Sequence, residues 1–85
     1  MDMARAAGVH VHSCNDPGCQ RGFPDLVLIG RRGVLYRELK VPPDDLTREQ
    51  RVIGYRLTAS GQDYAVWTEA DLASGLVWAQ VNAIY

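Results

Sequence analysis

Hydrophobic and polar residues alternate or cluster along this chain in a way that predicts short strands and helices. Residues 9–13 read Val-His-Val-His-Ser, and this period of two is typical of a short strand. Residues 26–29 form a continuous apolar run, which favours a strand buried on both faces. Gly-Arg-Arg-Gly at 30–33 then fits a hairpin turn, and residues 34–41 form the returning strand. The segment between the first two strands, 14–24, contains Gly and Pro and is expected to be a loop.

The clearest helix signal begins at Thr47. A threonine N-cap followed three residues later by Gln50 is a capping box. An apolar side that includes Tyr55 is expected to pack on the sheet, and Ser-Gly at 60–61 ends the helix. Gly54 lies mid-helix, where glycine costs about 1 kcal/mol relative to alanine, so we expect a close approach to the backbone at this position.

Three further elements follow from the same reasoning. Residues 2–7 suit a short helix, residues 64–67 an apolar strand, and residues 68–75 a short capped helix. Beyond Asp71 no residue is charged, and the tail over 76–85 is strongly apolar. Because a small domain rarely exposes such a segment, the tail either folds back on the core or packs on another subunit.

This succession of elements predicts one mixed α/β (α+β) domain over residues 1–85, with a small central sheet flanked by helices. A hydrophobic content of 47% argues against disorder. No apolar run reaches the roughly 20 residues of a membrane span, so we expect no membrane association. With no secretory signal pattern and only 2 cysteines, a cytoplasmic protein in a reducing compartment is expected.

Charge is distributed unevenly, although the formal net charge is only −1. Residues 21–56 have a net charge of +3, and the rest of the chain has a net charge of −4. A basic region of this kind suits a phosphodiester substrate, and a solvated face coated with arginines is the alternative interpretation. The candidate phosphate contacts within it are Arg21, Arg31, Arg32 and Arg48.

Two carboxylates and one ammonium group are expected to meet on the sheet. Asp25 directly follows Pro24 at the start of the buried strand, and the hairpin would bring it beside Glu38. Glu38 and Lys40 are two residues apart, so they project from the same face of the returning strand. Adjacent carboxylates repel and require a cation, and such oxygen ligands prefer Mg²⁺ or Mn²⁺. A turn aspartate and a solvated strand face are the structural alternatives.

A divalent metal at this position would suit hydrolysis of a phosphodiester. The metal lowers the pKa of a bound water and neutralises charge on the phosphate. The ammonium group of Lys40 would stabilise the transition state, and Gln50 is a candidate for orienting the attacking water or a metal ligand. The capping box explains Gln50 equally well without catalysis.

Three motifs in this order resemble the PD-(D/E)xK nuclease superfamily, and more narrowly the VRR-NUC family in its compact, virus-type, stand-alone form. They are Gly-Phe-Pro-Asp at 22–25, Glu-Leu-Lys at 38–40 and Leu-Thr-Arg-Glu-Gln at 46–50. The resemblance extends over about residues 8–72. It implies a restriction-endonuclease-like core and a Mg²⁺- or Mn²⁺-dependent endonuclease that cleaves DNA.

The resemblance also implies roles for individual residues. Asp25 and Glu38 would bind the metal together with the backbone carbonyl of Leu39. Lys40 would be the catalytic lysine, and Gln50 an accessory catalytic residue. Compact relatives look like homodimers acting on branched DNA such as four-way (Holliday) junctions, and two symmetric sites suit a two-fold-symmetric junction. A virus-encoded protein acting in a host cell would fit this form.

One departure from the family concerns the N-terminal helix. Many relatives carry an acidic residue there, whereas this chain offers only Asp2. The site would then hold one metal rather than two, or the protein would cleave poorly. A nuclease for flaps, nicks or nonspecific DNA and a weakly active DNA-binding module therefore stay as alternatives.

A series of soft ligands near the N-terminus allows a different function. His10, His12, Cys14 and Cys19 follow an H-x-H-x-C-x₄-C pattern. Four such side chains are able to bind zinc tetrahedrally, and a small zinc-binding interaction domain is the corresponding hypothesis. A disulfide between the cysteines is another alternative. His12 is also a candidate for a position near the scissile phosphate.

Overall fold

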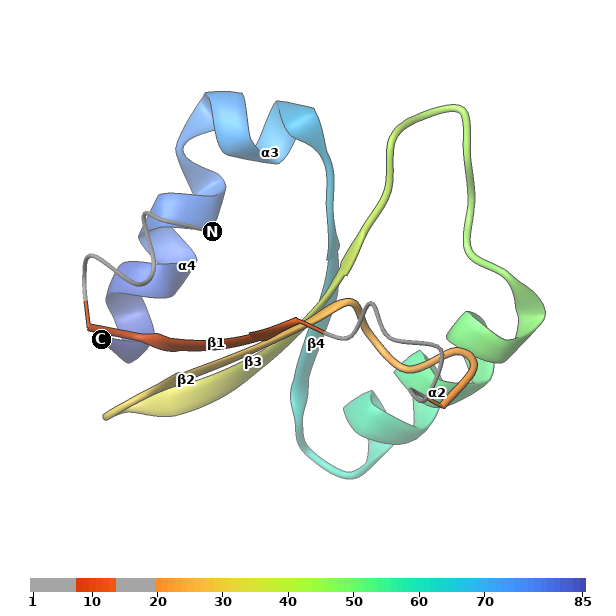
Figure 1. The fold of residues 1–85 in the computed structure, drawn as a ribbon, viewed down its shortest axis with the longest axis horizontal. Coiled ribbons are helices and arrows are strands. Elements are labelled where there is room, and N and C mark those ends of the chain that lie inside the picture. The colour runs from red at the N-terminus through yellow and green to blue at the C-terminus, as the bar shows by residue number, and fades with distance from the viewer. Residues whose placement is uncertain (1–7, 14–19) are drawn as a thin grey trace.

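The computed structural model describes residues 8–13 and 20–85, and within them a four-stranded mixed sheet is accompanied by three helices (Figure 1). The strand order is β1-β2-β3-β4; β2 is antiparallel to both β1 and β3, and β4 is parallel to β3. The strands are β1 (His10–Ser13), β2 (Leu26–Gly30), β3 (Gly33–Leu39) and β4 (Asp63–Trp67). The coarse prediction of a small mixed sheet flanked by helices is confirmed.

The helices cover different faces of this sheet. Helix α2 (Arg48–Ala59) connects β3 to β4, and α3 (Glu69–Ser74) and α4 (Leu76–Ile84) follow β4. From β4, Tyr64 faces Gly54 of α2, whereas Trp67 donates a 2.8 Å hydrogen bond to Gln80 of α4. Because residues separated by an odd number lie on opposite faces of a strand, α2 and α4 lie on opposite sides of the sheet (Figure 1).

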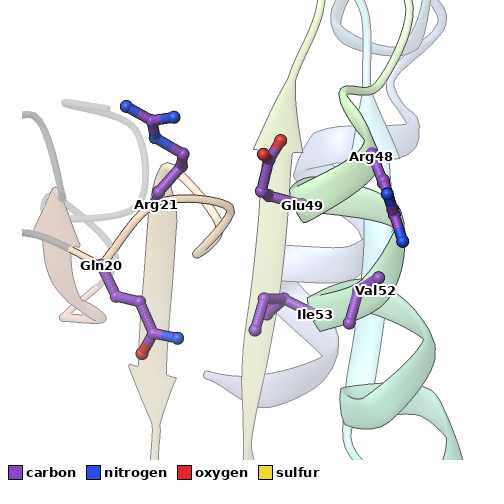
Figure 2. A pocket seen from close by; sticks show the side chains of 6 residues that line it. All are labelled: Gln20, Arg21, Arg48, Glu49, Val52 and Ile53. Atoms are coloured by element: carbon purple, nitrogen blue, oxygen red, sulfur yellow. The ribbon is translucent and has the colours of Figure 1, made fainter.

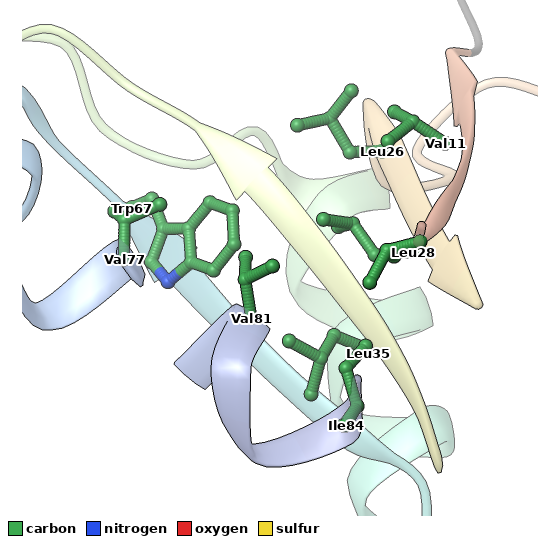
Figure 3. Close-up of a cluster of buried hydrophobic side chains, with 9 residues drawn as sticks. Val11, Leu26, Leu28, Leu35, Trp67, Val77, Val81 and Ile84 are labelled. Atoms are coloured by element: carbon green, nitrogen blue, oxygen red, sulfur yellow. The ribbon is translucent and has the colours of Figure 1, made fainter. Parts of the chain in front are cut away.

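The hydrophobic core lies between the sheet and α4 (Figure 3). Its side chains come from every second position of the strands and from the inner side of α4, as the alternation of a half-buried sheet requires. The buried members are Val9, Val11, Leu26, Leu28, Leu35, Trp67, Val77, Val81 and Ile84. The face toward α2 therefore takes little part in the core and is available for polar groups.

The apolar tail folds back on the core, which is one of the two arrangements expected for it. The backbone N–H of Arg32 in the hairpin donates a 2.9 Å hydrogen bond to the carbonyl of Ile84 at the end of α4. A Cβ at Gly30 would come within 2.0 Å of that same carbonyl oxygen, so only glycine permits this contact. Trp78 and Tyr85 stay 44% and 46% exposed, so packing of this region on a second subunit is still a prediction.

Two predicted strands need correction. Residues 26–29 are buried on one face only, and Ile29 is 45% exposed, because α2 packs against β4 and leaves part of the second face of β2 open. The strand predicted over 34–41 begins one residue earlier and ends at Leu39. Because the prolines at 42–43 have no N–H to donate, the strand cannot extend through them.

Helix α2 begins as predicted. The Thr47 hydroxyl accepts a 3.2 Å hydrogen bond from the Gln50 N–H, and the Thr47 N–H donates a 2.8 Å bond to the Gln50 side-chain oxygen. The expected packing of Tyr55 on the sheet is wrong, since this side chain is 74% exposed and Gly54 is the one buried residue of the helix. The contact with the sheet is made on the other side of α2.

Two arginines of the basic region form hydrogen bonds and ion pairs within the protein. Arg37 is 1% exposed, and its guanidinium bonds to Asp63 at 2.9 Å and to Gln80 at 3.0 Å. On the surface, Arg51 pairs with Asp45 at 2.8 Å. These two arginines are therefore already engaged, and the surface offered to an anionic partner is less basic than the sequence suggests.

The short helix predicted over 2–7, with Asp2, lies outside the described residues, as do Cys14 and Cys19. In the described ranges, no helix is both long enough and apolar enough to cross a bilayer.

Candidate functional site

The strand register brings two carboxyl groups face to face. Leu26 pairs with Arg37 at the end of the β2–β3 ladder, so the next residues outward, Asp25 and Glu38, stand opposite each other. Directly opposed residues project from the same face. Since neighbouring Arg37 points toward α4, the two carboxyls lie on the α2 side of the sheet.

Glu38 is a buried acid without a complete set of partners. It is 1% exposed, and its Oε2 atom has no hydrogen-bond partner within the described residues. The pKa of Glu38 is raised to about 8, chiefly by burial and then by a hydrogen bond with the Asp25 carboxyl and by the charge of Asp25, while the charge of Lys40 acts in the opposite direction. At neutral pH the carboxyl pair therefore needs either a proton or a cation to be stable.

Pro24 shapes the backbone beside these carboxyls. If the β2–β3 pairing is continued outward, Pro24 lies opposite Leu39. Because proline has no N–H, it cannot donate a hydrogen bond to the Leu39 carbonyl. The Leu39 N–H donates instead to Asp25 Oδ2 at 2.9 Å. Because the N–H and C=O of one extended residue point to the same side of a strand, the Leu39 carbonyl is also directed toward the Asp25 side. The sequence-predicted ligand set, Asp25, Glu38 and Leu39, is thus brought together.

Lys40 lies immediately beyond β3. Its backbone N–H donates a 3.0 Å hydrogen bond to the Trp67 carbonyl, which holds it against the end of β4. Its charge lowers the pKa of Glu38, from which it is separated by one residue along the chain. The two acids and the lysine predicted from the hairpin therefore occupy one place in the fold.

Gln50 is placed mainly by its helix. Its side-chain oxygen accepts the Thr47 N–H in the capping box, which is the structural alternative considered for it. That oxygen is held at the start of the helix, and its second lone pair is the acceptor left for any accessory role. The catalytic assignment of Gln50 stays a prediction.

The loop leading to Asp25 is fixed on the first turn of α2. A Cβ at Gly22 would lie 2.6 Å from the backbone of Glu49, so the loop approaches the helix more closely than any other residue would allow. A pocket of about 320 Å³ opens between them (Figure 2). Arg21 comes to it from the loop and Arg48 from α2, with Glu49 between them on the helix. Two predicted phosphate contacts thus border one hollow.

The other predicted DNA contacts lie elsewhere. Arg31 and Arg32 occupy the tip of the hairpin, about 20 Å along the strands from the carboxyl pair at some 3.4 Å per residue. Arg31 also lies over the Tyr85 ring at 5.7 Å. His12 is exposed on β1 and pairs with Val27, two positions from Asp25, so it shares the α2 side of the sheet with the carboxyls.

Sequence reasoning gave no role to Tyr64, which the structure adds to this site. Its hydroxyl is buried without a hydrogen-bond partner among the described groups. Burial raises the pKa of the Tyr64 hydroxyl, and the charges of Glu38 and Asp25 raise it further. Gly54 was the available signal, because a Cβ there would lie 2.5 Å from the tyrosine ring. The glycine predicted a close approach without indicating which group makes it.

Two carboxylates and a backbone carbonyl suit Mg²⁺ or Mn²⁺, which keep several waters, better than a metal that takes all its ligands from the protein. Nowhere in residues 8–13 and 20–85 do three His, Cys, Asp or Glu side chains gather in a metal-binding group. Two carboxylates and a backbone carbonyl suffice for Mg²⁺, which keeps several waters and takes further ligands from substrate phosphates. The predicted zinc group stays untested because its cysteines are outside the described ranges.

No protein-family model, curated protein or solved structure matches the chain. The evidence for a function is accordingly the chemistry of the site itself.

Proposed function

We propose that this protein is a Mg²⁺- or Mn²⁺-dependent DNA endonuclease of the PD-(D/E)xK type, with branched DNA such as a four-way junction as its substrate. The observation that carries the proposal is the opposition of Asp25 and the buried Glu38 on one sheet face, with the Leu39 backbone beside them. This arrangement is costly for a protein with no cation to bind.

A bound metal would supply a water of lowered pKa and a positive charge for the phosphate oxygens. The residues of the chain provide the rest. The Leu39 N–H holds Asp25 in place, and the Lys40 ammonium offers a proton-donating group to the negative charge that develops on the phosphate. Arg21 and Arg48 would hold the phosphates of the substrate strand at the adjacent pocket.

Cleavage of labelled DNA tests the proposal. A four-way junction and its linear duplex are incubated with Mg²⁺, Mn²⁺ or EDTA, using wild-type protein, Lys40→Ala and the control Arg56→Ala. Arg56 is an exposed residue of α2 outside the predicted site, so this variant loses the same charge without touching the carboxyls. We expect paired cuts on the junction that need the metal, persist in Arg56→Ala and are lost in Lys40→Ala.

Other outcomes lead to different conclusions. Equal cutting of junction and duplex would support a nuclease without junction selectivity. Binding of the junction without cleavage would favour the DNA-binding module. Cleavage that survives Lys40→Ala would show that the site has been assigned wrongly.

The predicted homodimer has a test of its own. A dimeric mass in solution would support the predicted homodimer, and a monomeric mass would exclude it.

A further inference from the structure

Two buried polar atoms in the described part of the chain lack hydrogen-bond partners. They are Glu38 Oε2 and the Tyr64 hydroxyl oxygen. Buried polar groups in folded proteins nearly always have a partner, either in the protein or in an ordered water. Two such atoms on one face of the sheet can be satisfied by one shared group.

The sheet places these two residues near each other. Tyr64 on β4 pairs with Tyr36 on β3, and Glu38 is two residues farther along β3 on the same face. The negative charges of Glu38 and Asp25 raise the pKa of the Tyr64 hydroxyl, in addition to the effect of burial. The hydroxyl therefore keeps its proton at neutral pH and is able to donate it in a hydrogen bond.

Helix α2 fixes the tyrosine ring in this position. A Cβ on Gly54 would lie 2.5 Å from Cε1 and 2.6 Å from Cζ of Tyr64, so the ring lies directly against the helix backbone. With the helix on one side and the sheet on the other, the ring has little freedom to turn its hydroxyl away. The chain keeps a glycine in the middle of a helix at the one place where this ring needs room.

We propose that Tyr64 is a positioning residue of the metal site, whose hydroxyl donates to a buried water that in turn donates to Glu38 Oε2. This inference rests on the proposed function and assigns to it a residue beyond the acid–lysine set. A carboxylate held through one oxygen presents its other oxygen to a metal in a fixed direction. Groups that orient metal ligands in this way commonly change metal affinity by about 10- to 100-fold when they are removed.

Tyr64→Phe tests the role of the hydroxyl, because it removes one oxygen and keeps the ring against Gly54. The matched control is Tyr36→Phe, which removes the same atom from the paired residue on β3, whose ring packs on Phe23. Mn²⁺ binding is measured by titration calorimetry on the full chain without DNA. We expect roughly tenfold weaker binding for Tyr64→Phe and less than a twofold change for Tyr36→Phe.

Further measurements separate positioning from stability and from the proposed function. Thermal unfolding of the metal-free Tyr64→Phe protein should match wild type within a few degrees, and on a cleaved substrate kcat should fall while KM is unchanged. If wild type binds Mn²⁺ and Tyr64→Phe binds it equally well, this inference is wrong and the proposed metal site still stands. Failure of wild type to bind Mn²⁺ at all would overturn both.

Discussion

The backbone N–H of Leu39 donates a 2.9 Å hydrogen bond to Asp25 Oδ2, which ties the start of β2 to the end of β3 at the carboxyl pair. The carboxylate of Asp25 therefore has two functions that substitutions can separate. One oxygen completes the backbone hydrogen bonding where Pro24 cannot, and the negative charge contributes to the proposed cation site.

Asp25→Asn and Asp25→Ala should separate these functions. Asparagine retains an oxygen that accepts the Leu39 N–H but has no charge, so we expect near-wild-type stability and a loss of Mn²⁺ binding. Alanine also removes the acceptor, and its free energy of unfolding should be lower by about 1 kcal/mol. Urea unfolding and Mn²⁺ titration measure the two effects. Unchanged Mn²⁺ affinity in Asp25→Asn would remove this residue from the site.

The stability of the metal-free protein should depend on pH through Glu38. Its pKa is raised from 4.5 to about 8, so between these values the folded state binds more protons than the unfolded state. The Glu38 contribution to stability is therefore full below pH 4.5 and declines as the pH rises toward 8. Urea unfolding in EDTA at several pH values should show this decline in wild type and its loss in Glu38→Gln. A decline of the same size in both proteins would assign the effect to other groups.

Gly54→Ala should destabilise the protein, although alanine is the better helix former. Intrinsic propensity alone would favour the substitution by about 1 kcal/mol. The new Cβ would meet the Tyr64 ring at 2.5 Å, and overpacking of this kind costs about 1–3 kcal/mol. We expect a net loss in the free energy of unfolding, measured in urea. In a Tyr64→Leu background the same substitution should be less harmful or favourable, and equal costs in both backgrounds would contradict the contact.

Arg37→Met should be among the most damaging single substitutions. The buried guanidinium joins β3 to Asp63 of β4 and to Gln80 of α4, and it lies 5.3 Å from the Trp67 ring. Its removal takes one donor from the Gln80 oxygen and the guanidinium donor from the Asp63 backbone carbonyl, which should cost about 1–3 kcal/mol. Arg56→Met, on the exposed side of α2, should change stability by less than about 0.5 kcal/mol. Comparable losses in the two variants would show that the buried network contributes little.

Local signals in the sequence predicted most of the fold. The capping box at Thr47 located the start of α2, and the glycines around Arg31 and Arg32 located the hairpin. The hairpin then predicted that Asp25 lies near Glu38, because antiparallel pairing converts separation along the chain into opposition across the strands. These features depend on neighbours within a few residues or on a single turn.

Features that depend on distant parts of the chain were not predictable in this way. Arg37 looked like part of a basic surface, because its partners Asp63 and Gln80 are 26 and 43 residues away. The tail carries a helical spacing at Val77, Val81 and Ile84, but the position of α4 depends on contacts with the distant hairpin. The position of Tyr64 near the carboxyls was not predictable either, since it arises only when β4 pairs with β3.

The alternation of side chains in β3 assigns consecutive residues to different tasks: Arg37 anchors the α4 layer and Glu38 belongs to the opposite, acidic face. Two residues that are adjacent in the chain are thus separated onto opposite faces of the sheet. The acidic face can be redesigned for another cation or another reaction while the apolar layer that makes the chain fold is left intact, so this small sheet offers a compact frame for building new chemistry.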